Sequence, residues 1–262
     1  MPMTLFKESS ETIRTACISN QNLLSKNRYK NPHLFSWWLA GLIDADGLLL
    51  VSKTGYTSCE ITVAEEKWQI LALVKSKLGG SIKKRTRVKA LRWRLHNTPG
   101  MKTLSLLISG KLMLKKKSDQ LIKVCRQLKI EERGAPYLFS KENAWLTGFF
   151  EGKGYFNLNK NNLQLSITLS LKDKTLLDEI ASLMGGRVYY DKSWHGWLYA
   201  ASDVDDIALW VKHFSRFPLI SCKQIQLRRF IRLLLYKSRN VHLKKEGKDR
   251  ARFNRLVSGF SE

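Results

Sequence analysis

The chain has 262 residues, of which 44% are hydrophobic, enough to fill the core of one or two domains and too many for a disordered chain. Its 46 Lys and Arg residues outnumber its 22 Asp and Glu residues, so the net charge is +24 and the pI is near 10.0. Such self-repulsion indicates a polyanionic partner, and nucleic acid is the first candidate. Charge or glycine interrupts every apolar run short of the roughly 18 residues that a membrane span needs, so we expect no membrane partner.

Neither the cysteines nor the N-terminus carries a recognisable signal. Cys17, Cys59, Cys125 and Cys222 are widely spaced and form no CxxC pair, so we expect reduced residues rather than a zinc site or a disulfide framework. The first 30 residues contain acidic side chains, which transit peptides tend to lack, and we predict no targeting signal there.

The hydrophobic pattern predicts the same order of elements in both halves of the chain. In the first half, a helix that ends near residue 47 is followed by strands at 48–52 and 56–63, a helix at 66–78, strands at 81–88 and 91–96, and a mostly helical stretch at 98–130. In the second half, a helix from about Ser140 is followed by strands at 155–159 and 163–171, a helix at 173–184, strands at 188–190 and 197–200, and helices at 204–214 and 221–238. We therefore predict an α+β fold of two αββαββα units.

The predicted boundaries divide the chain into five segments. Gly134 and Pro136 mark a linker, and the residues after the last helix are basic and without a clear pattern, so we expect an irregular tail. The segments are an N-terminal extension at 1–32, a first unit at 33–130, the linker at 131–139, a second unit at 140–238 and a basic C-terminal tail at 239–262.

A repeated motif supports the duplication. Trp38 to Gly47 reads WLAGLIDADG, and 107 positions later Trp145 to Gly154 reads WLTGFFEGKG. Two more landmarks recur at an offset of 106, because Gly79-Gly80 is echoed by Gly185-Gly186 and the stretch from Lys117 by the stretch from Lys223. Three landmarks that keep nearly one offset indicate two copies of one structural unit.

Small residues predict how the two motif helices meet. Residues four apart share a helix face, and each motif has such a pair: Gly41 with Ala45, and Gly148 with Gly152. Two faces without side chains let backbones approach closely, so we expect the helices to pack on each other at a pseudo-twofold axis. The residues at their ends, Asp46 and Lys153, should then meet near that axis.

The motifs resemble those of the LAGLIDADG homing endonucleases in their monomeric, two-repeat form, and the resemblance extends from about residue 33 to residue 239. It implies a saddle of β-strands for nucleic acid, a divalent cation held by an acid from each motif, and a lysine near each scissile phosphate. It gives Asp44 and Glu151 a structural role near the helix interface. It also points to organellar introns, and to a mitochondrion rather than a chloroplast.

Asp46 and two lysines are the candidate catalytic residues. Hydrolysis of a phosphodiester needs a cation to generate hydroxide and neutralise charge, and Mg²⁺ prefers carboxylate and water ligands, which makes Asp46 the predicted metal ligand. The family's lysine follows an apolar lead, as Lys223 does after Pro218, and the repeat offset gives Lys117 as its partner. For either lysine, a solvated helix position is an equally good interpretation.

Lys153 departs from the family pattern, because it stands where a second acid is expected. A protonated amine cannot coordinate Mg²⁺, and at about 4 Å and an effective dielectric near 20 each unit charge pair is worth roughly 4 kcal/mol. We consider a natural loss of cleavage, an enzyme that nicks one strand, and a deliberately disabled protein. The ammonium could also replace the cation and bind phosphate, keeping binding while removing hydrolysis.

The predicted third and fourth strands of each unit suggest two different binding surfaces. A β-ribbon can enter the major groove, and seven unbalanced charges are unusual for a merely solvated face. The first ribbon carries the candidate contacts Lys83, Lys84, Arg85, Arg87, Lys89, Arg92 and Arg94. The second has few charges and many rings, some of which must be core, and contributes Arg187, Tyr189, Lys192, Trp197 and Tyr199.

Two functions fit these features. The first is a sequence-specific, Mg²⁺-dependent DNA endonuclease whose cleavage is impaired or reduced to nicking by Lys153. The second is a non-cleaving RNA-binding protein, an intron maturase or a fixed part of an organellar ribonucleoprotein such as a ribosome. For the first we expect a monomer. The basic segment from Lys223 to Arg255, with twelve Lys and Arg residues against two acids, is a further nucleic-acid arm in either case.

Overall fold

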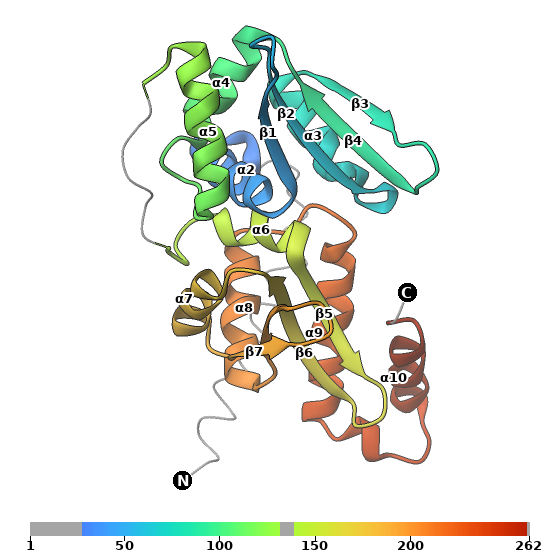
Figure 1. The fold of residues 1–262 in the computed structure, drawn as a ribbon. Coiled ribbons are helices and arrows are strands. Elements are labelled where there is room, and N and C mark those ends of the chain that lie inside the picture. Colours follow the sequence, from blue (N-terminus) through green and yellow to red (C-terminus); the bar gives the residue numbers. More distant parts are fainter. Residues whose placement is uncertain (1–27, 132–138, 261–262) are drawn as a thin grey trace. The chain divides into compact units, whose positions relative to one another are not determined.

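The computed structural model describes residues 28–131 and 139–260, which form two compact units (Figure 1). The motif unit contains residues 28–131 and 139–153 together with Leu219–Cys222, and the C-terminal unit contains Gly154–Pro218 and residues 223–260. Both motif helices therefore belong to one compact unit, although the sequence repeat assigns them to different halves. Cys17, the expected N-terminal extension up to residue 27 and most of the expected linker lie outside the described residues.

The first motif helix, α2 (Pro32–Asp46), forms the centre of the motif unit. The side chain of Asn31 caps its N-terminus by accepting hydrogen bonds from the N–H groups of His33 and Leu34, and Pro32 occupies the first turn, where no N–H is needed. Every residue from Phe35 to Ala45 is buried. A helix buried on all sides needs partners all round, and the second motif helix is one of them.

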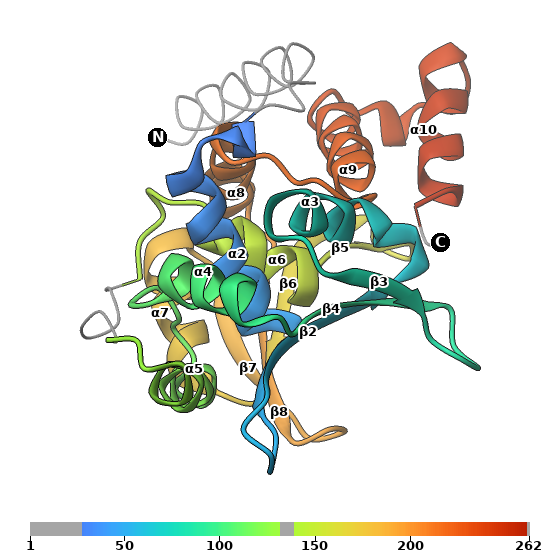
Figure 2. The same ribbon diagram turned by 90° about the horizontal axis from the view of Figure 1, so that it is seen from above.

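The second motif helix, α6 (Trp145–Lys153), packs directly on α2 (Figure 2). A Cβ added at Gly41 would lie 1.9 Å from the carbonyl oxygen of Trp145, and one added at Gly148 would lie 1.9 Å from that of Trp38. Each contact is the other shifted by the repeat offset of 107, so the packing is pseudo-symmetric. The close contact predicted from the spacing of small residues is confirmed.

The first turn of α6 begins later than the sequence suggests. We expected a helix from about Ser140, but Ser140 Oγ accepts from Glu142 N in a turn, and Asn143 Oδ1 accepts from Trp145 N, where α6 begins. Both Ser140 and Asn143 accept hydrogen bonds from backbone N–H groups, and the helix starts after Asn143, which lies nearer the apolar run.

The sheet of the motif unit is antiparallel, in the order β1-β2-β4-β3. Its strands are β1 (Gly47–Val51), β2 (Thr57–Ala64), β3 (Ser81–Lys84) and β4 (Ala90–Leu95). One face carries Leu49, Ile61 and Trp93, all buried, and packs against the helices. The sheet starts directly at the end of α2, because Gly47 is both the C-cap of the helix and the first residue of β1.

Helices cover the inner face of this sheet. The turn η2 (Glu65–Lys67) leads into α3 (Trp68–Leu78), followed after the second hairpin by α4 (Thr98–Ile108) and α5 (Lys115–Leu128). We expected one mostly helical stretch at 98–130, whereas the chain breaks between α4 and α5. Gly110, with φ of +73°, permits the break, and the Asn97 side chain caps the start of α4.

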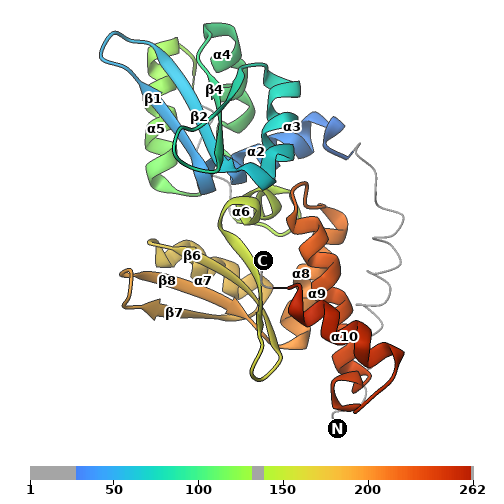
Figure 3. The same ribbon diagram turned by 90° about the vertical axis from the view of Figure 1, so that its right-hand side faces the viewer.

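The C-terminal unit repeats this topology with the sheet order β5-β6-β8-β7. Its strands are β5 (Gly154–Asn159), β6 (Gln164–Leu171), β7 (Arg187–Asp191) and β8 (Gly196–Ala201). The helices α7 (Lys174–Met184), α8 (Val204–Arg216) and α9 (Lys223–Ser238) pack with it, and Figure 3 shows α8 and α9 on one side of the sheet. Buried rings of Phe156, Phe214 and Phe230 join the sheet to α8 and α9.

The segment after α9 is helical, which corrects the expected irregular tail. The turn η3 (Val241–Leu243) leads into α10 (Lys248–Ser258), which packs on α9. One buried ring carries this packing: Phe253 is 2% exposed and meets Tyr236 edge to face at 6.2 Å. The predicted α+β fold of two repeated helix–hairpin–helix–hairpin–helix units is otherwise confirmed, with one further helix closing each repeat.

The contact between the motif helices predicts the effect of a single methyl group. Gly148→Ala should destabilise the protein by about 3 kcal/mol, because the new Cβ meets backbone that cannot move away as a side chain could. Gly259→Ala is the matched control, since its Cβ would meet its nearest atom at an ordinary 3.4 Å, and we expect a change of at most about 0.5 kcal/mol. Urea unfolding measures both, and equal midpoints would contradict the close packing.

Candidate functional site

The ends of the motif helices bring Asp46 and Lys153 together. Lys153 Nζ donates to Asp46 Oδ1 at 2.9 Å, and both side chains reach solvent, being 37% and 23% exposed for the lysine and the aspartate. Gly152 permits this contact, because a Cβ there would lie 2.6 Å from Asp46 Oδ2. The expected meeting of the two residues is confirmed, and it takes the form of an ion pair.

Asp44 and Glu151 are buried and fix the chain around the helix ends. Asp44 accepts hydrogen bonds from Met113 N at 2.8 Å, Trp145 Nε1 at 2.9 Å and Leu114 N at 3.3 Å, and so holds the start of α5. Glu151 accepts from Ile220 N at 2.5 Å and from the N–H of Ser221 at 3.2 Å. The two acids therefore make equivalent hydrogen bonds to the backbone, at positions 107 residues apart.

Burial sets the protonation chemistry of Asp44. Loss of solvent raises its pKa to about 7, against the lowering effects of the hydrogen bonds from Met113, Trp145 and Leu114 and of the charge on Lys117. With its oxygens engaged by N–H groups and 1% exposure, this carboxyl has no face open to a metal or a phosphate.

The two candidate lysines occupy equivalent positions. Lys117 Nζ donates to the carbonyl oxygen of Gly47, and Lys223 Nζ donates to that of Gly154, so each lysine binds the residue directly after a motif helix. Burial lowers the pKa of Lys117; the charges of Asp44 and Asp46 raise it, and those of Lys116 and Lys153 lower it further. Lys223 is 2% exposed, with its Nζ 5.2 Å from the ring centroid of Tyr155. Its ammonium thus faces the protein in this conformation.

The residues at the helix ends do not fit a divalent cation shared by the two motifs. Within residues 28–131 and 139–260, no group of three or more His, Cys, Asp and Glu side chains gathers in a way that could hold a metal. Asp46 contributes one carboxylate, and an ammonium occupies the position from which a second should come. Because the pair contains one acid and one base, it is as well suited to binding an oxyanion as to binding a metal ion.

The strand register decides which basic residues of the first sheet face away from the helices. Arg92 and Arg94 of β4 and Lys83 of β3 lie on the outer face, opposite Trp93. Glu60 on the neighbouring strand pairs with both arginines, at 3.4 and 3.2 Å. Lys84 points to the other face and pairs with Glu65 at 2.7 Å.

The hairpin between β3 and β4 carries three more exposed cations. Its expected contacts Arg85, Arg87 and Lys89 are all exposed, and Arg87 has a left-handed backbone with φ of +67°. Leu48 and Leu50 of β1, which the charge pattern did not reveal, lie on the same outer face and are 39% and 41% exposed. Side chains alternate between the two faces along β1, and Leu49 is buried. This alternation is the sequence signal that could have identified Leu48 and Leu50.

The second sheet places only part of the predicted set on its outer face. Arg187 and Tyr189 are exposed there, and Lys192 is exposed in the β7–β8 hairpin. The prediction for Tyr199 is wrong: its side chain is fully buried, and its hydroxyl accepts from Trp210 Nε1 at 2.8 Å. Trp197 lies two residues away on the same, helix-facing side, half-buried beneath Lys174.

The outer face of the second sheet also contains a residue that composition did not reveal. Tyr155 of β5 is 53% exposed and pairs across the ladder with Thr168. Because Phe156 packs into the core, strand alternation turns Tyr155 outward, and this alternation is visible in the sequence. The outer face of the second sheet thus carries rings, amides and hydroxyls, with few charges.

In the part of the chain that the structure describes, no helix combines the length and the apolar character that a bilayer crossing requires.

The model of the LAGLIDADG endonuclease family matches residues 146–234. The intron-encoded DNA endonuclease ai2b of Dictyostelium discoideum is 30% identical over 192 residues, covering 69% of this chain and 72% of that protein. The probable intron-encoded endonuclease aI2 of Debaryomyces hansenii is 32% identical over 260 residues, 87% of this chain and 39% of that protein.

A relative with a different described activity is also similar. The intron-encoded RNA maturase bI4 of Saccharomyces cerevisiae is 38% identical over 175 residues, which is 64% of this chain. The chain spans 39% of the length of aI2 and 27% of that of bI4.

Solved structures share the fold. The meganuclease I-SmaMI bound to an uncleavable DNA superposes with a TM-score of 0.71 at 20% identity, covering 88% of this chain and 99% of that one. The same protein has been solved on an uncleaved DNA target in the presence of calcium ions. With its paired motifs, its duplicated sheets and a relative matched over most of its length, the chain belongs to the LAGLIDADG endonuclease family.

Proposed function

We propose that the chain binds duplex DNA in a sequence-specific manner through the outer faces of its two sheets, and that it does not cut both strands. The single observation that carries this proposal is the ion pair between Asp46 and Lys153 at the ends of the packed motif helices. Family membership and the basic first sheet support DNA binding, and the ion pair supports the loss of double-strand cutting.

The loss of cutting follows from charge at the helix ends. Two cuts need a carboxylate from each motif, and this chain offers Asp46 alone, because Asp44 and Glu151 are buried in hydrogen bonds with backbone N–H groups. The ammonium of Lys153 donates to Asp46 at 2.9 Å and brings a positive charge to the helix ends. It can therefore hold a phosphate near the axis without supplying a nucleophile. Magnesium and one-strand nicking at Asp46 remain parts of the proposal to be measured.

The sheet faces account for recognition. Arg92 and Arg94 stand on the outer face with Lys83, and such side chains contact phosphates or the O6 and N7 atoms of guanine. Glu60 holds the two guanidinium groups, which fixes their direction before DNA binds. The second sheet presents Tyr155, Tyr189 and Arg187 instead. The two half-sites of the target should consequently differ in sequence.

RNA binding is the second candidate function. Two observations favour it: bI4, an RNA maturase by name, is 38% identical to this chain, and rings outnumber charges on the second sheet. Exposed tyrosines can stack on the unpaired bases of structured RNA. In this alternative the Asp46–Lys153 pair is simply the remnant of a cleavage site, and the chain acts as a maturase or as a fixed part of a ribonucleoprotein.

The proposal includes organisation and location. We place the two repeats at 33–130 and 140–238, acting together as a monomer on one nucleic acid. The relatives named as intron-encoded support an organellar location, with a mitochondrion preferred to a chloroplast.

Removal of the two outer-face arginines tests the binding surface. For the double variant Arg92→Ser with Arg94→Ser, we expect affinity for a duplex selected from a random library to fall at least about tenfold, because two phosphate or base contacts are lost. The slope of log K against log salt should decrease by about 2. Fluorescence anisotropy across a salt series measures both quantities.

The control for this experiment keeps the charge change and moves it away from the sheet. Lys75→Ser with Lys102→Ser removes two exposed charges from helices α3 and α4. Equal losses in both variants would mean that net charge, and not the sheet face, binds the duplex. A structured intron RNA that outcompetes the selected duplex at matched salt would favour the maturase alternative.

Reversal of one charge tests the loss of cutting. With strand-specific end labels on the selected duplex and added Mg²⁺, we expect no double-strand product from the natural chain and a gain of double-strand cutting in Lys153→Asp, which supplies the second carboxylate. Lys153→Ala is the matched control, because it removes the ammonium without adding an acid, and it should cut one strand at most. Cutting of both strands by the natural chain would disprove the proposal. An inactive Lys153→Asp variant that still binds would show that Lys153 is not what prevents cutting.

A further inference from the structure

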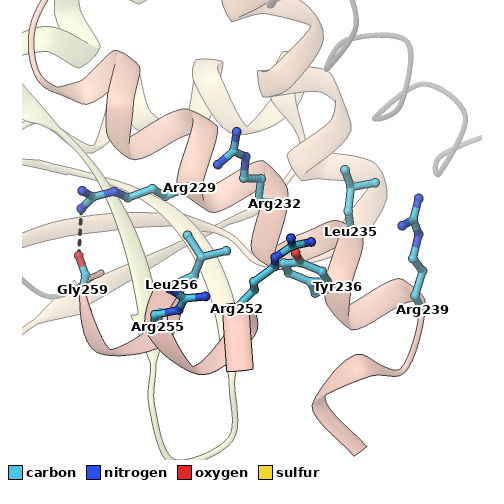
Figure 4. Close-up of a pocket in the computed structure, with 9 residues that line it drawn as sticks. All are labelled: Arg229, Arg232, Leu235, Tyr236, Arg239, Arg252, Arg255, Leu256 and Gly259. Atoms are coloured by element: carbon cyan, nitrogen blue, oxygen red, sulfur yellow. Dashed lines mark hydrogen bonds between the residues drawn. The ribbon is translucent and has the colours of Figure 1, made fainter. Parts of the chain in front are cut away.

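A groove lined by arginines lies on the helical side of the C-terminal unit, between α9 and α10 (Figure 4). Along α9, its residues follow helical spacing, at 229, 232, 235 and 236, and along α10 and its C-cap they lie at 252, 255, 256 and 259. Each helix therefore turns one face to the same cavity, which has a volume of about 630 Å³. The complete lining is Arg229, Arg232, Leu235, Tyr236, Arg239, Arg252, Arg255, Leu256 and Gly259.

Packing beneath the groove holds the two walls in place. Phe253 is buried against Tyr236, and the ring of Phe260 lies 6.2 Å from that of Phe230 on α9. Arg229 donates to the carbonyl oxygen of Gly259 at 2.9 Å, which ties the end of α10 to α9. The groove is thus a built feature of this unit, formed by a helix that follows the second repeat.

The charge of the groove is not balanced. Five arginines line it, all of them exposed, and no Asp or Glu is among the lining residues. Arg252 pairs with Asp249 at 3.7 Å, whereas Arg232, Arg239 and Arg255 have no ion pair within residues 28–131 and 139–260. Guanidinium groups gathered without counterions repel one another, and a polyanion relieves that repulsion.

The remaining lining residues indicate which polyanion fits. Tyr236 supplies a ring, and Leu235 and Leu256 supply apolar surface, next to guanidinium planes that can also stack on bases. A positively charged groove with an aromatic side chain is the usual arrangement for a single nucleic-acid strand, whose bases are free to stack. A duplex hides its base faces and would use only the charges on the rim.

We propose that this arginine groove is a second nucleic-acid site, which holds the phosphodiester backbone of a single-stranded segment and stacks a base on Tyr236. The site extends the proposed function and rests on it only for the class of ligand. It is separate from the outer face of the β5–β8 sheet, because α9 packs its buried face on the inner side of that sheet through Phe156 and Phe230 and carries the groove on another face.

The proposal is tested with one substitution on each wall. For Arg232→Ser with Arg255→Ser, we expect affinity for a single-stranded RNA of about 12 nucleotides to fall at least about tenfold, and the salt slope to decrease by about 1.4. Affinity for the selected duplex should stay within about twofold of the natural chain, whereas the Arg92→Ser with Arg94→Ser variant should show the opposite pattern. Lys244→Ser with Lys245→Ser, exposed lysines outside the groove lining, is the matched control and should change neither.

Substitution of the ring separates stacking from charge. Tyr236→Leu should weaken single-strand binding at least about fivefold, and Tyr236→Phe should restore it, since Phe keeps the ring on which a base stacks and the contact with Phe253. If RNA and DNA strands of one sequence bind equally, the groove contacts only phosphates and base faces. If RNA binds more tightly, the groove also contacts the 2′-hydroxyl.

Several outcomes overturn the proposal. Single-strand affinity unchanged in the groove variant would do so, as would a loss of duplex affinity equal to that of the sheet variant. If neither sheet nor groove variant affected the duplex while the groove variant lost single-strand binding, the sheet-face function would fail and the groove would stand. Binding of an acidic peptide that single strands cannot displace would assign the groove to a protein partner instead.

Discussion

The backbone-to-backbone contact of α2 and α6 is the constraint on which the site depends. At Gly41 and Gly148 there is no room for even one methyl group between the helices. Because both helices end within this close packing, the residues that follow their small faces, Asp46 and Lys153, are forced to within 2.9 Å of each other. Each sheet then starts at the next residue along the chain, Gly47 or Gly154.

The two repeats share their scaffold contacts but differ in the charge of the residue at their centre. Asp44 and Glu151 bind equivalent backbone N–H groups, and Lys117 and Lys223 bind equivalent carbonyl oxygens. Asp44, Glu151 and Lys223 are buried, so loss of their partners would be costly, since an unpaired buried polar group costs about 1–3 kcal/mol. Asp46 and Lys153 are 23% and 37% exposed, so water can solvate a changed charge there, and an acid can be replaced by a base while the fold is kept.

Much of this arrangement could be predicted from the sequence, because it follows from periodicity. The four-residue spacing of Gly41 with Ala45 and of Gly148 with Gly152 predicted the helix contact, and the repeat offset predicted the position of Lys153 opposite Asp46. The composition of the ribbons did not give the direction of their side chains: Tyr199 is buried and Lys84 faces the helices, since strand pairing assigns alternate residues to opposite faces. The helix α10 was missed because a single ring, Phe253, packs it on α9, and one ring produces no periodic signal.

The distribution of counterions distinguishes the two basic surfaces more sharply than their charge does. On the first sheet, Glu60 neutralises part of Arg92 and Arg94 and directs them, which suits contacts that must meet particular base edges. In the groove, Arg232, Arg239 and Arg255 have no such partner within the described residues, and nothing selects a base there except the ring of Tyr236. Guanidinium groups that an acidic partner holds in one direction favour sequence-specific contacts. Guanidinium groups without such a partner favour binding to any nucleic-acid strand. The two proposed sites therefore differ in kind, with directed guanidinium groups on the first sheet and undirected ones in the groove.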